Sequence, residues 1–227
     1  MHIETGVVQG TKMILSYGTA ALSFGIAAKL AIDNVKENGV LSLMVKSVFT
    51  TILVLMFFEV FPHHSVGVSE VHLILGSTLF LIFGMAPAAF GLAGGLLLQG
   101  LFFAPFDLPQ YGMNVTSLLI PLFAMSVLAK KIIPESVAYK DIKYSQTLQL
   151  SIVYQGGIIS WVAFWAFYGQ GFGSENLAEV ASFCAVYTSV ILVEPLIDLV
   201  VLAGAKMMCR LKGSTFVESR LYHPVEA

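Results

Sequence analysis

Residues 42–61 read SLMVKSVFTTILVLMFFEVF, and this apolar stretch decides what kind of fold the chain adopts. Lys46 and Glu59 are its only charged side chains. An α-helix needs roughly 20 residues to cross about 30 Å of hydrocarbon, which is the length of this stretch. The segment therefore predicts a transmembrane helix.

The rest of the chain has the same apolar character. Of its 227 residues, 57% are hydrophobic and only 11% are charged, and the mean hydropathy is +0.83. Soluble domains carry about 25% charged residues. Seven apolar segments are apparent, at approximately residues 13–32, 42–61, 69–84, 86–105, 114–129, 147–169 and 180–205. We therefore expect an all-α integral membrane protein, a bundle of about seven transmembrane helices.

The basic residues predict the orientation, because short loops rich in Lys and Arg stay on the cytoplasmic side. The loops 62–68, 106–113 and 170–179 contain neither residue, and Lys12 alone is expected on their side. The others, expected on the inner side, are Lys29, Lys36, Lys46, Lys130, Lys131, Lys140, Lys143, Lys206, Arg210, Lys212 and Arg220. We expect a multi-pass protein of the cytoplasmic (inner) membrane with its amino terminus outside. Residues 1–205 would form one transmembrane domain, and residues 206–227 a short cytoplasmic tail.

The amino terminus, Met1-His2-Ile3, is the segment with the most specific chemistry. It lacks the basic region and cleavage site of a signal peptide, so we expect Met1 to remain, with a free amine. That amine, the His2 amide and the His2 imidazole can close successive chelate rings on one metal, leaving a fourth position for another imidazole. Nitrogen-rich sites of this kind favour Ni2+ and Cu2+ and can hold Co2+, whereas Mg2+ and Ca2+ prefer oxygen. The arm is a candidate site for a divalent transition metal.

Four of the five histidines are expected on the outer side: His2, His63, His64 and His72. His63 and His64 lie in a polar loop, where they can simply be solvated surface residues. Ser69 resembles a helix N-cap with Glu70 in the first turn, which would place His72 one turn into a helix at the mouth of the bundle. An interfacial histidine there can be merely hydrogen-bonded, but beside Met1-His2 it becomes the best candidate for the fourth metal ligand.

Several motifs together resemble a known family. They are Met1-His2-Ile3 with Gly6, Phe61-Pro62, Ser69-x-x-His72-Leu73-x-x-Gly76, Gln99-x-x-Phe102-Phe103-Ala104 and Gly112-x-Asn114-x-x-Ser117. This pattern is similar to the substrate-capture component of cobalt and nickel energy-coupling-factor importers, the CbiM/NikM type. The motifs span roughly residues 1–130, and beyond them only the hydropathy agrees.

The resemblance implies a ligand set and partners. The metal would be held by the Met1 amine, the His2 amide and imidazole, and His72, with Asn114 close by. Apart from the resemblance, we expect His63, His64 and Ser69 as accessory residues. The cargo would be Co2+, or secondly Ni2+, with cobalamin synthesis as its purpose. A transmembrane coupling protein and a pair of cytoplasmic ATPases would drive transport. This chain has no nucleotide-binding loop of the GxxxxGK[ST] type, so we expect a transport subunit rather than an enzyme, without a nucleic-acid partner.

Three carboxylates are predicted inside or at the edge of the membrane: Glu59, Glu194 and Asp198. Such groups are costly there and are functional candidates. Glu194 and Asp198 lie four residues apart on one helical face, which suits a proton or cation relay. Alternatively, they pair with Lys29 or Lys46 near the inner surface.

Two other functions are alternatives for this sequence. Coupling through these carboxylates would make the chain a stand-alone secondary transporter. A membrane oxidoreductase is disfavoured, because no span carries histidines three or four residues apart. Cys184 and Cys209 show no CxxC spacing, and we expect neither a disulfide nor a metal site from them.

Overall fold

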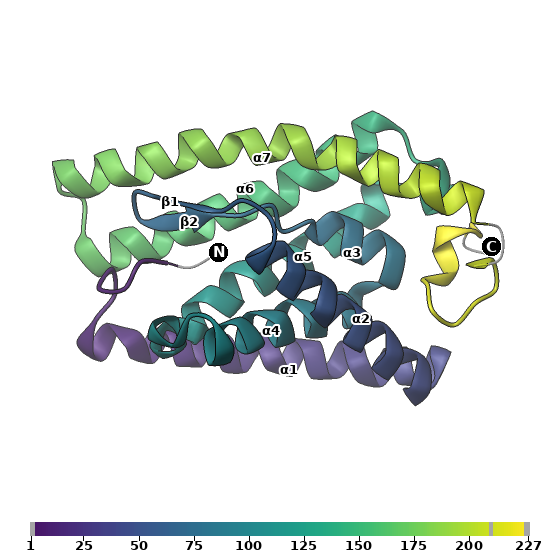
Figure 1. Ribbon diagram of the computed structural model, residues 1–227, viewed down its shortest axis with the longest axis horizontal. Coiled ribbons are helices and arrows are strands. Elements are labelled where there is room, and N and C mark those ends of the chain that lie inside the picture. The colour runs from purple at the N-terminus through teal and green to yellow at the C-terminus, as the bar shows by residue number, and fades with distance from the viewer. Residues whose placement is uncertain (1–2, 209–210, 225–227) are drawn as a thin grey trace.

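The computed structural model describes residues 3–208 and 211–224 as a bundle of helices (Figure 1). Six of them are long: α1 (Met13–Asn38), α2 (Val40–Glu59), α4 (Met85–Phe102), α5 (Tyr111–Ile132), α6 (Tyr144–Gln170) and α7 (Ser174–Met207). Each has the length and apolar composition needed to cross a membrane. A short helix, α3 (Gly76–Phe83), and a hairpin of β1 (His64–Val66) and β2 (Ser69–Val71) lie between α2 and α4. Six of the seven predicted spans are thus confirmed as long helices.

The prediction of a continuous helix over residues 69–84 is wrong. Its first part is β2, which pairs antiparallel with β1, and α3 is only eight residues long. Gly67, with φ +58°, makes the tight turn between the strands. Leu75 has a left-handed backbone conformation, φ 55°, directly before α3, so the helix does not extend back toward His72. The backbone N–H and C=O groups of residues 69–71 therefore form hydrogen bonds between strands and not within a helix.

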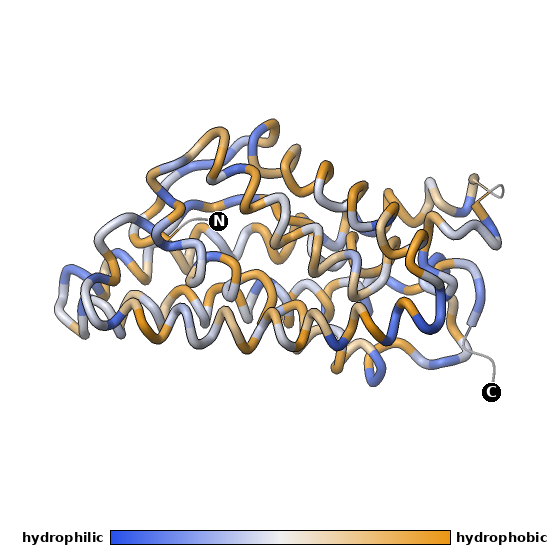
Figure 2. Tube along the Cα trace, turned by 90° about the horizontal axis from the view of Figure 1, so that it is seen from below, coloured by the Kyte–Doolittle hydropathy of each residue, from blue (hydrophilic) through white to orange (hydrophobic). Residues whose placement is uncertain are grey.

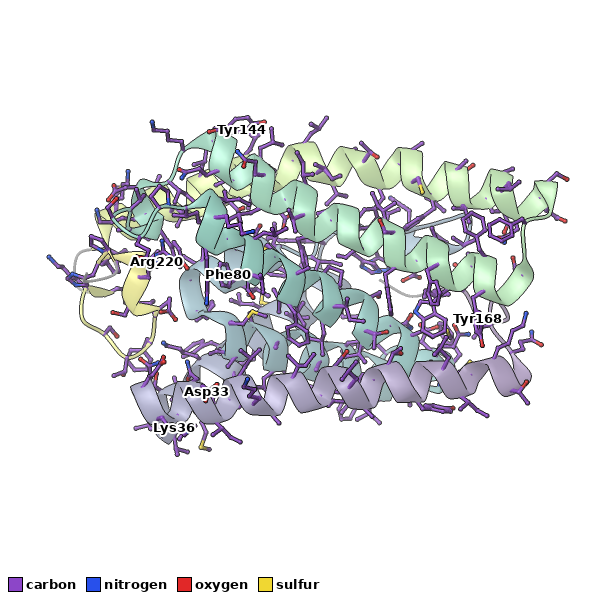
Figure 3. The ribbon with its side chains drawn as sticks, turned by 180° about the vertical axis from the view of Figure 1, so that it is seen from behind. Asp33, Lys36, Phe80, Tyr144, Tyr168 and Arg220 are labelled. Atoms are coloured by element: carbon purple, nitrogen blue, oxygen red, sulfur yellow. The ribbon has the colours of Figure 1, made fainter. Side chains whose placement is uncertain are left out.

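The hairpin and α3 together carry the chain along the bundle. In Figure 1 the hairpin lies at the end where α7 begins, and α3 lies toward the opposite end, where α7 ends. Hydrophilic residues gather at the two ends of the bundle, with mainly hydrophobic segments between them (Figure 2). Figure 3 shows Lys36 and Arg220 at one of these ends and Tyr168 at the other. Both basic residues therefore share the end that the sequence predicts to be cytoplasmic.

Close helix packing relies on small residues where α4 contacts α2. A Cβ atom on Gly91 would lie 2.4 Å from the Thr50 side chain, and one on Gly95 would lie 2.5 Å from Val54. Glycine lets two helix backbones approach in lipid, where the hydrophobic effect supplies no force between them. Because the two helices lie so close, the Thr50 hydroxyl can donate a hydrogen bond of 2.7 Å to the Pro87 carbonyl.

The segment 211–224, which follows α7, folds back onto the end of the bundle. The Glu218 amide donates to the Ile82 carbonyl at 2.7 Å. Arg220 donates to the carbonyls of Ile133 and Pro134, and its guanidinium lies 4.8 Å from the centroid of the Tyr139 ring. These contacts tie the segment to the last turn of α3 and to the loop after α5.

Candidate metal site at the amino-terminal arm

The amino-terminal arm, residues 3–12, enters the bundle beside the hairpin. Ile3 is completely buried and forms an antiparallel bridge with Ser69 of β2. The next residue, Glu4, donates its amide to the Val68 carbonyl at 3.0 Å. The arm therefore lies along the edge of β2, in the manner of a third strand.

Two polar side chains at the start of α5 hold the backbone of the arm from the other side. The Ile3 amide donates to Oδ1 of Asn114 at 2.9 Å. Gln110, with its amide nitrogen as the donor, bonds the Ile3 carbonyl at 2.8 Å and the Glu4 carbonyl at 3.2 Å. Asn114 and Gln110 are both buried, so these bonds form away from solvent. Both backbone polar groups of Ile3 are thus fixed by side chains.

Asn114 is among the site residues predicted from the sequence, whereas Gln110 is not. Gln110 could have been found from its spacing, because it precedes Asn114 by four residues at the beginning of an apolar segment. Residues four apart lie on the same face of a helix. Met1 and His2, the predicted chelating residues, lie outside the described residues.

His72 follows β2 directly, and its side chain is completely buried. Its Nε2 lies 2.9 Å from Oε2 of Glu70, and its ring makes a T-shaped contact with that of Phe58, with centroids 5.2 Å apart. Burial lowers the pKa of the His72 imidazole far below its ordinary value, so the ring stays neutral. A neutral imidazole retains the lone pair that a metal requires.

The local geometry around His72 differs from the prediction. Ser69 is not an N-cap, and His72 is not in a helix, because residues 69–71 pair with β1 and α3 begins only at Gly76. Ser69 instead forms the antiparallel bridge with Ile3 of the amino-terminal arm. The strand explains why Glu70 reaches His72: residues two apart in an extended chain point to the same side. A carboxylate on one imidazole nitrogen fixes the ring orientation and raises its basicity as a ligand.

The other two candidate histidines differ from each other. The ring of His63 stacks on that of His72, with centroids 5.0 Å apart and planes at 14°. His64 is an exposed residue of β1 opposite Val71, where solvation alone accounts for its position. The structure thus brings His63 next to His72 and leaves His64 on the surface of the hairpin.

Three carboxylates surround the arm. Glu4 follows Ile3, Glu70 contacts His72, and Asp107 is buried in the 3-10 turn η2 (Pro105–Gln110), close enough to interact electrostatically with both. Their combined negative charge favours an approaching divalent cation. In the part of the chain that the structure describes, no three His, Cys, Asp or Glu side chains form a metal-binding group by themselves.

Glu194 and Asp198 lie elsewhere, buried within the bundle on α7. Glu194 is hydrogen-bonded by Ser151 and Gln155 of α6, whereas Asp198 accepts from Ser77 and Thr78 of α3. Over residues 3–208 and 211–224, no ion pair joins either carboxylate to Lys29 or Lys46, so the predicted pairing with lysine is wrong. The reason is position: polar residues of α3 and α6, not the basic end of the bundle, face these side chains.

The fold and the site thus define a multi-pass membrane protein with a buried histidine beside its inserted amino-terminal arm. Residues 2–208 match the family described as "Cobalt uptake substrate-specific transmembrane region", CbiM. The chain therefore belongs to the CbiM family, which confirms the resemblance and extends it beyond residue 130. No curated protein and no solved structure matched the chain.

Proposed function

We propose that this protein captures Co2+, and secondarily Ni2+, as the metal-specific component of an ATP-driven energy-coupling-factor importer. The donors are the Met1 amine, the His2 amide and imidazole, and the His72 imidazole. The observation that carries this proposal is the position of Ile3. Ile3 is held against β2, and His72 directly follows this strand. His2 is only one peptide unit from Ile3, about 3.8 Å between α-carbons.

Glu70 selects the nitrogen of His72 that binds the metal. With the ring proton on Nε2, where it faces the Glu70 carboxylate, the lone pair lies on Nδ1. Glu70, Glu4 and Asp107 then attract the divalent cation without replacing the nitrogen donors. The hydrogen bond that Asn114 accepts from Ile3 and those that Gln110 donates to the arm would hold the arm closed over the ion.

The proposed topology places the amino terminus and the metal site outside and the carboxyl terminus inside. The end of the bundle that carries Lys36 and Arg220 would face the cytoplasm, as expected for a protein of the inner membrane. A transmembrane coupling protein would contact the bundle, and a pair of cytoplasmic ATPases would drive release. The cobalt would supply cobalamin synthesis.

The test compares two histidines of one segment. His72→Ala removes the buried candidate ligand, and His64→Ala removes an exposed histidine of the same hairpin. We expect Co2+ affinity, measured by calorimetry on the purified protein in detergent, to drop at least tenfold for His72→Ala and to stay unchanged for His64→Ala. Both variants should retain the thermal unfolding profile of the fold. Equal affinities for the two variants would remove His72 from the ligand set.

A second candidate function, a stand-alone secondary transporter, draws support from the buried pair Glu194 and Asp198. Uptake of radioactive cobalt by cells that contain only this chain separates the two. An ATP-driven importer component requires its ATPase subunits for accumulation. A secondary transporter works alone and loses uptake in Glu194→Gln while still binding the metal.

A further inference from the structure

A polar cluster is buried in the bundle where the first residues of α3 and the middle of α6 pack against α7. It contains Glu194 and Asp198, whose side chains are 0% exposed. Neither carboxylate belongs to the metal site described above, and burying two of them in a membrane protein is costly unless their charge is balanced.

Asp198 has the surroundings of an ionised carboxylate. Its Oδ2 accepts a hydrogen bond of 2.8 Å from the Ser77 hydroxyl, and its Oδ1 accepts one from the Thr78 hydroxyl. Both donors lie at the beginning of α3, where the helix dipole also favours a negative charge. Each oxygen of Asp198 is therefore supplied with a donor.

The hydrogen bonds that α6 donates to Glu194 both reach the same oxygen. Its Oε2 accepts from the Ser151 hydroxyl at 2.9 Å and from the Gln155 amide at 2.8 Å. Its Oε1 has no hydrogen-bond partner within 3.5 Å among the described residues, although Ser77 also lies close to the Glu194 carboxylate. Oε1 of Gln155 and the hydroxyl groups of Tyr154 and Tyr187 likewise have no partner among the described residues. All of these side chains are completely buried. The Gln155 amide nitrogen donates to Glu194. Two acceptor oxygens of this cluster, Oε1 of Glu194 and Oε1 of Gln155, therefore lack a donor among the described residues.

The charge of the pair is not balanced by a base. In the described chain, no lysine, arginine or histidine bonds to either carboxylate. The titratable groups that face Glu194 are Asp198 and Tyr187 from α7 and Tyr154 from α6. The polar side chains that α3 contributes to the cluster are hydroxyl groups. Two neighbouring carboxylates in such a site cannot both stay ionised at low cost.

We propose that Glu194 is a proton-binding site, which holds one proton on Oε1 while Asp198 remains ionised. A proton needs a single lone pair, and Glu194 Oε1 offers one. A metal cation needs several oxygen ligands, whereas the other three carboxylate oxygens of the pair already accept hydrogen bonds. The bound proton also converts an acceptor without a donor into a donor.

The site connects to the metal arm through one continuous segment. Ser69 bridges Ile3, His72 follows β2, and Ser77 donates to Asp198. A change of charge at Glu194 therefore acts on Ser77, the second residue of α3, which lies five residues after His72. The proton site itself depends only on the cluster, and it stands whether or not His72 binds cobalt.

Infrared spectroscopy of the full-length protein in detergent at pH 7 tests the proposal. We expect a carbonyl stretching band of a protonated carboxyl group that shifts in heavy water, is absent from Glu194→Gln and is present in Glu175→Gln. Glu175 is an exposed glutamate in the first turn of α7, which makes it the matched control. A spectrum in which Glu194→Gln removes no such band overturns the proposal.

Thermal unfolding provides a second readout. A glutamine side chain is neutral, as the protonated acid is, so Glu194→Gln should unfold at the temperature of the unmodified protein. Asp198→Asn removes the charge to which Ser77 and Thr78 donate, and should unfold at a clearly lower temperature. The reverse order, or a Glu194→Gln variant that does not fold, would mean that Glu194 is the ionised partner and would overturn the assignment.

Discussion

The backbone amide of Ile3 donates a 2.9 Å hydrogen bond to the side-chain oxygen of Asn114, across a sequence separation of 111 residues. Ile3 is also bridged to Ser69 and is completely buried. The first described residue of the chain is therefore fixed by two distant segments. This arrangement links the amino terminus to the segment that carries His72, and most of the following predictions depend on it.

Replacing Asn114 with Ala should weaken metal binding through the arm. The substitution leaves the buried Ile3 amide without its acceptor, a loss of about 1–3 kcal/mol. We expect the Co2+ dissociation constant measured by calorimetry to rise by about tenfold. Asn176→Ala is the control, because Asn176 bonds the carbonyls of Ala166 and Gly171 away from the arm. That variant should lose thermal stability but keep its affinity; equal losses of affinity would contradict the role of Asn114.

Replacing Glu70 with Gln should reduce cobalt affinity without removing a ligand. The neutral amide no longer raises the basicity of the His72 ring or adds negative charge beside it. We expect affinity to fall by roughly tenfold, within the range typical of carboxylates that orient metal-binding histidines. Calorimetry on Glu70→Gln and on Glu4→Gln separates the two effects. If both variants bind cobalt with equal affinity, Glu70 contributes to the affinity through its negative charge and not by orienting the His72 ring.

Blocking the terminal amine should abolish capture. An acetyl group or an uncleaved, histidine-free tag turns the amine into an amide of low basicity and removes a donor of the proposed chelate. Cobalt uptake and binding should fail for this protein and persist when the same tag is placed after Ala227. Undiminished uptake by the amino-terminally tagged protein would show that the terminal amine is not a ligand.

Cobalt affinity should fall as the pH decreases from 7 to 5. Unperturbed imidazole and terminal amine groups have pKa values of about 6.5 and 7.7–8.0, so protons would compete with the metal for donors of this kind. Burial lowers the pKa of His72, which therefore stays neutral across this range and does not contribute to the loss. Calorimetry at successive pH values checks the trend. A flat profile would favour a carboxylate site formed by Glu4, Glu70 and Asp107.

The turn of the hairpin should tolerate no side chain at Gly67. A Cβ atom there would lie 2.2 Å from the Glu179 carbonyl oxygen, and the residue has φ +58°. Gly213 has a similarly positive φ, +79°, but open space around its α-carbon. Gly213→Ala should therefore show only the backbone strain, about 1–2 kcal/mol. Gly67→Ala should lower the thermal unfolding temperature further and weaken cobalt binding, because the hairpin must move away from α7. Identical behaviour of both variants would rule out the clash.

The sequence by itself determined the class of the protein and most of its helices. A transmembrane helix satisfies its backbone hydrogen bonds within its own residues, so a long apolar stretch such as residues 42–61 suffices to predict one. The motifs around Met1-His2-Ile3 and His72 likewise indicated the family that residues 2–208 match.

Only the tertiary structure decided what residues 69–75 do. Ser69 and Glu70 have the local features of a helix start, yet their strand depends on β1 and on Ile3, which a local pattern does not reveal. The roles of Gln110 at the arm and of Ser77 at Asp198 depend equally on contacts between segments far apart in the chain. Bonds of this kind form only after the helices pack, because their two partners approach each other through the fold and not through the sequence.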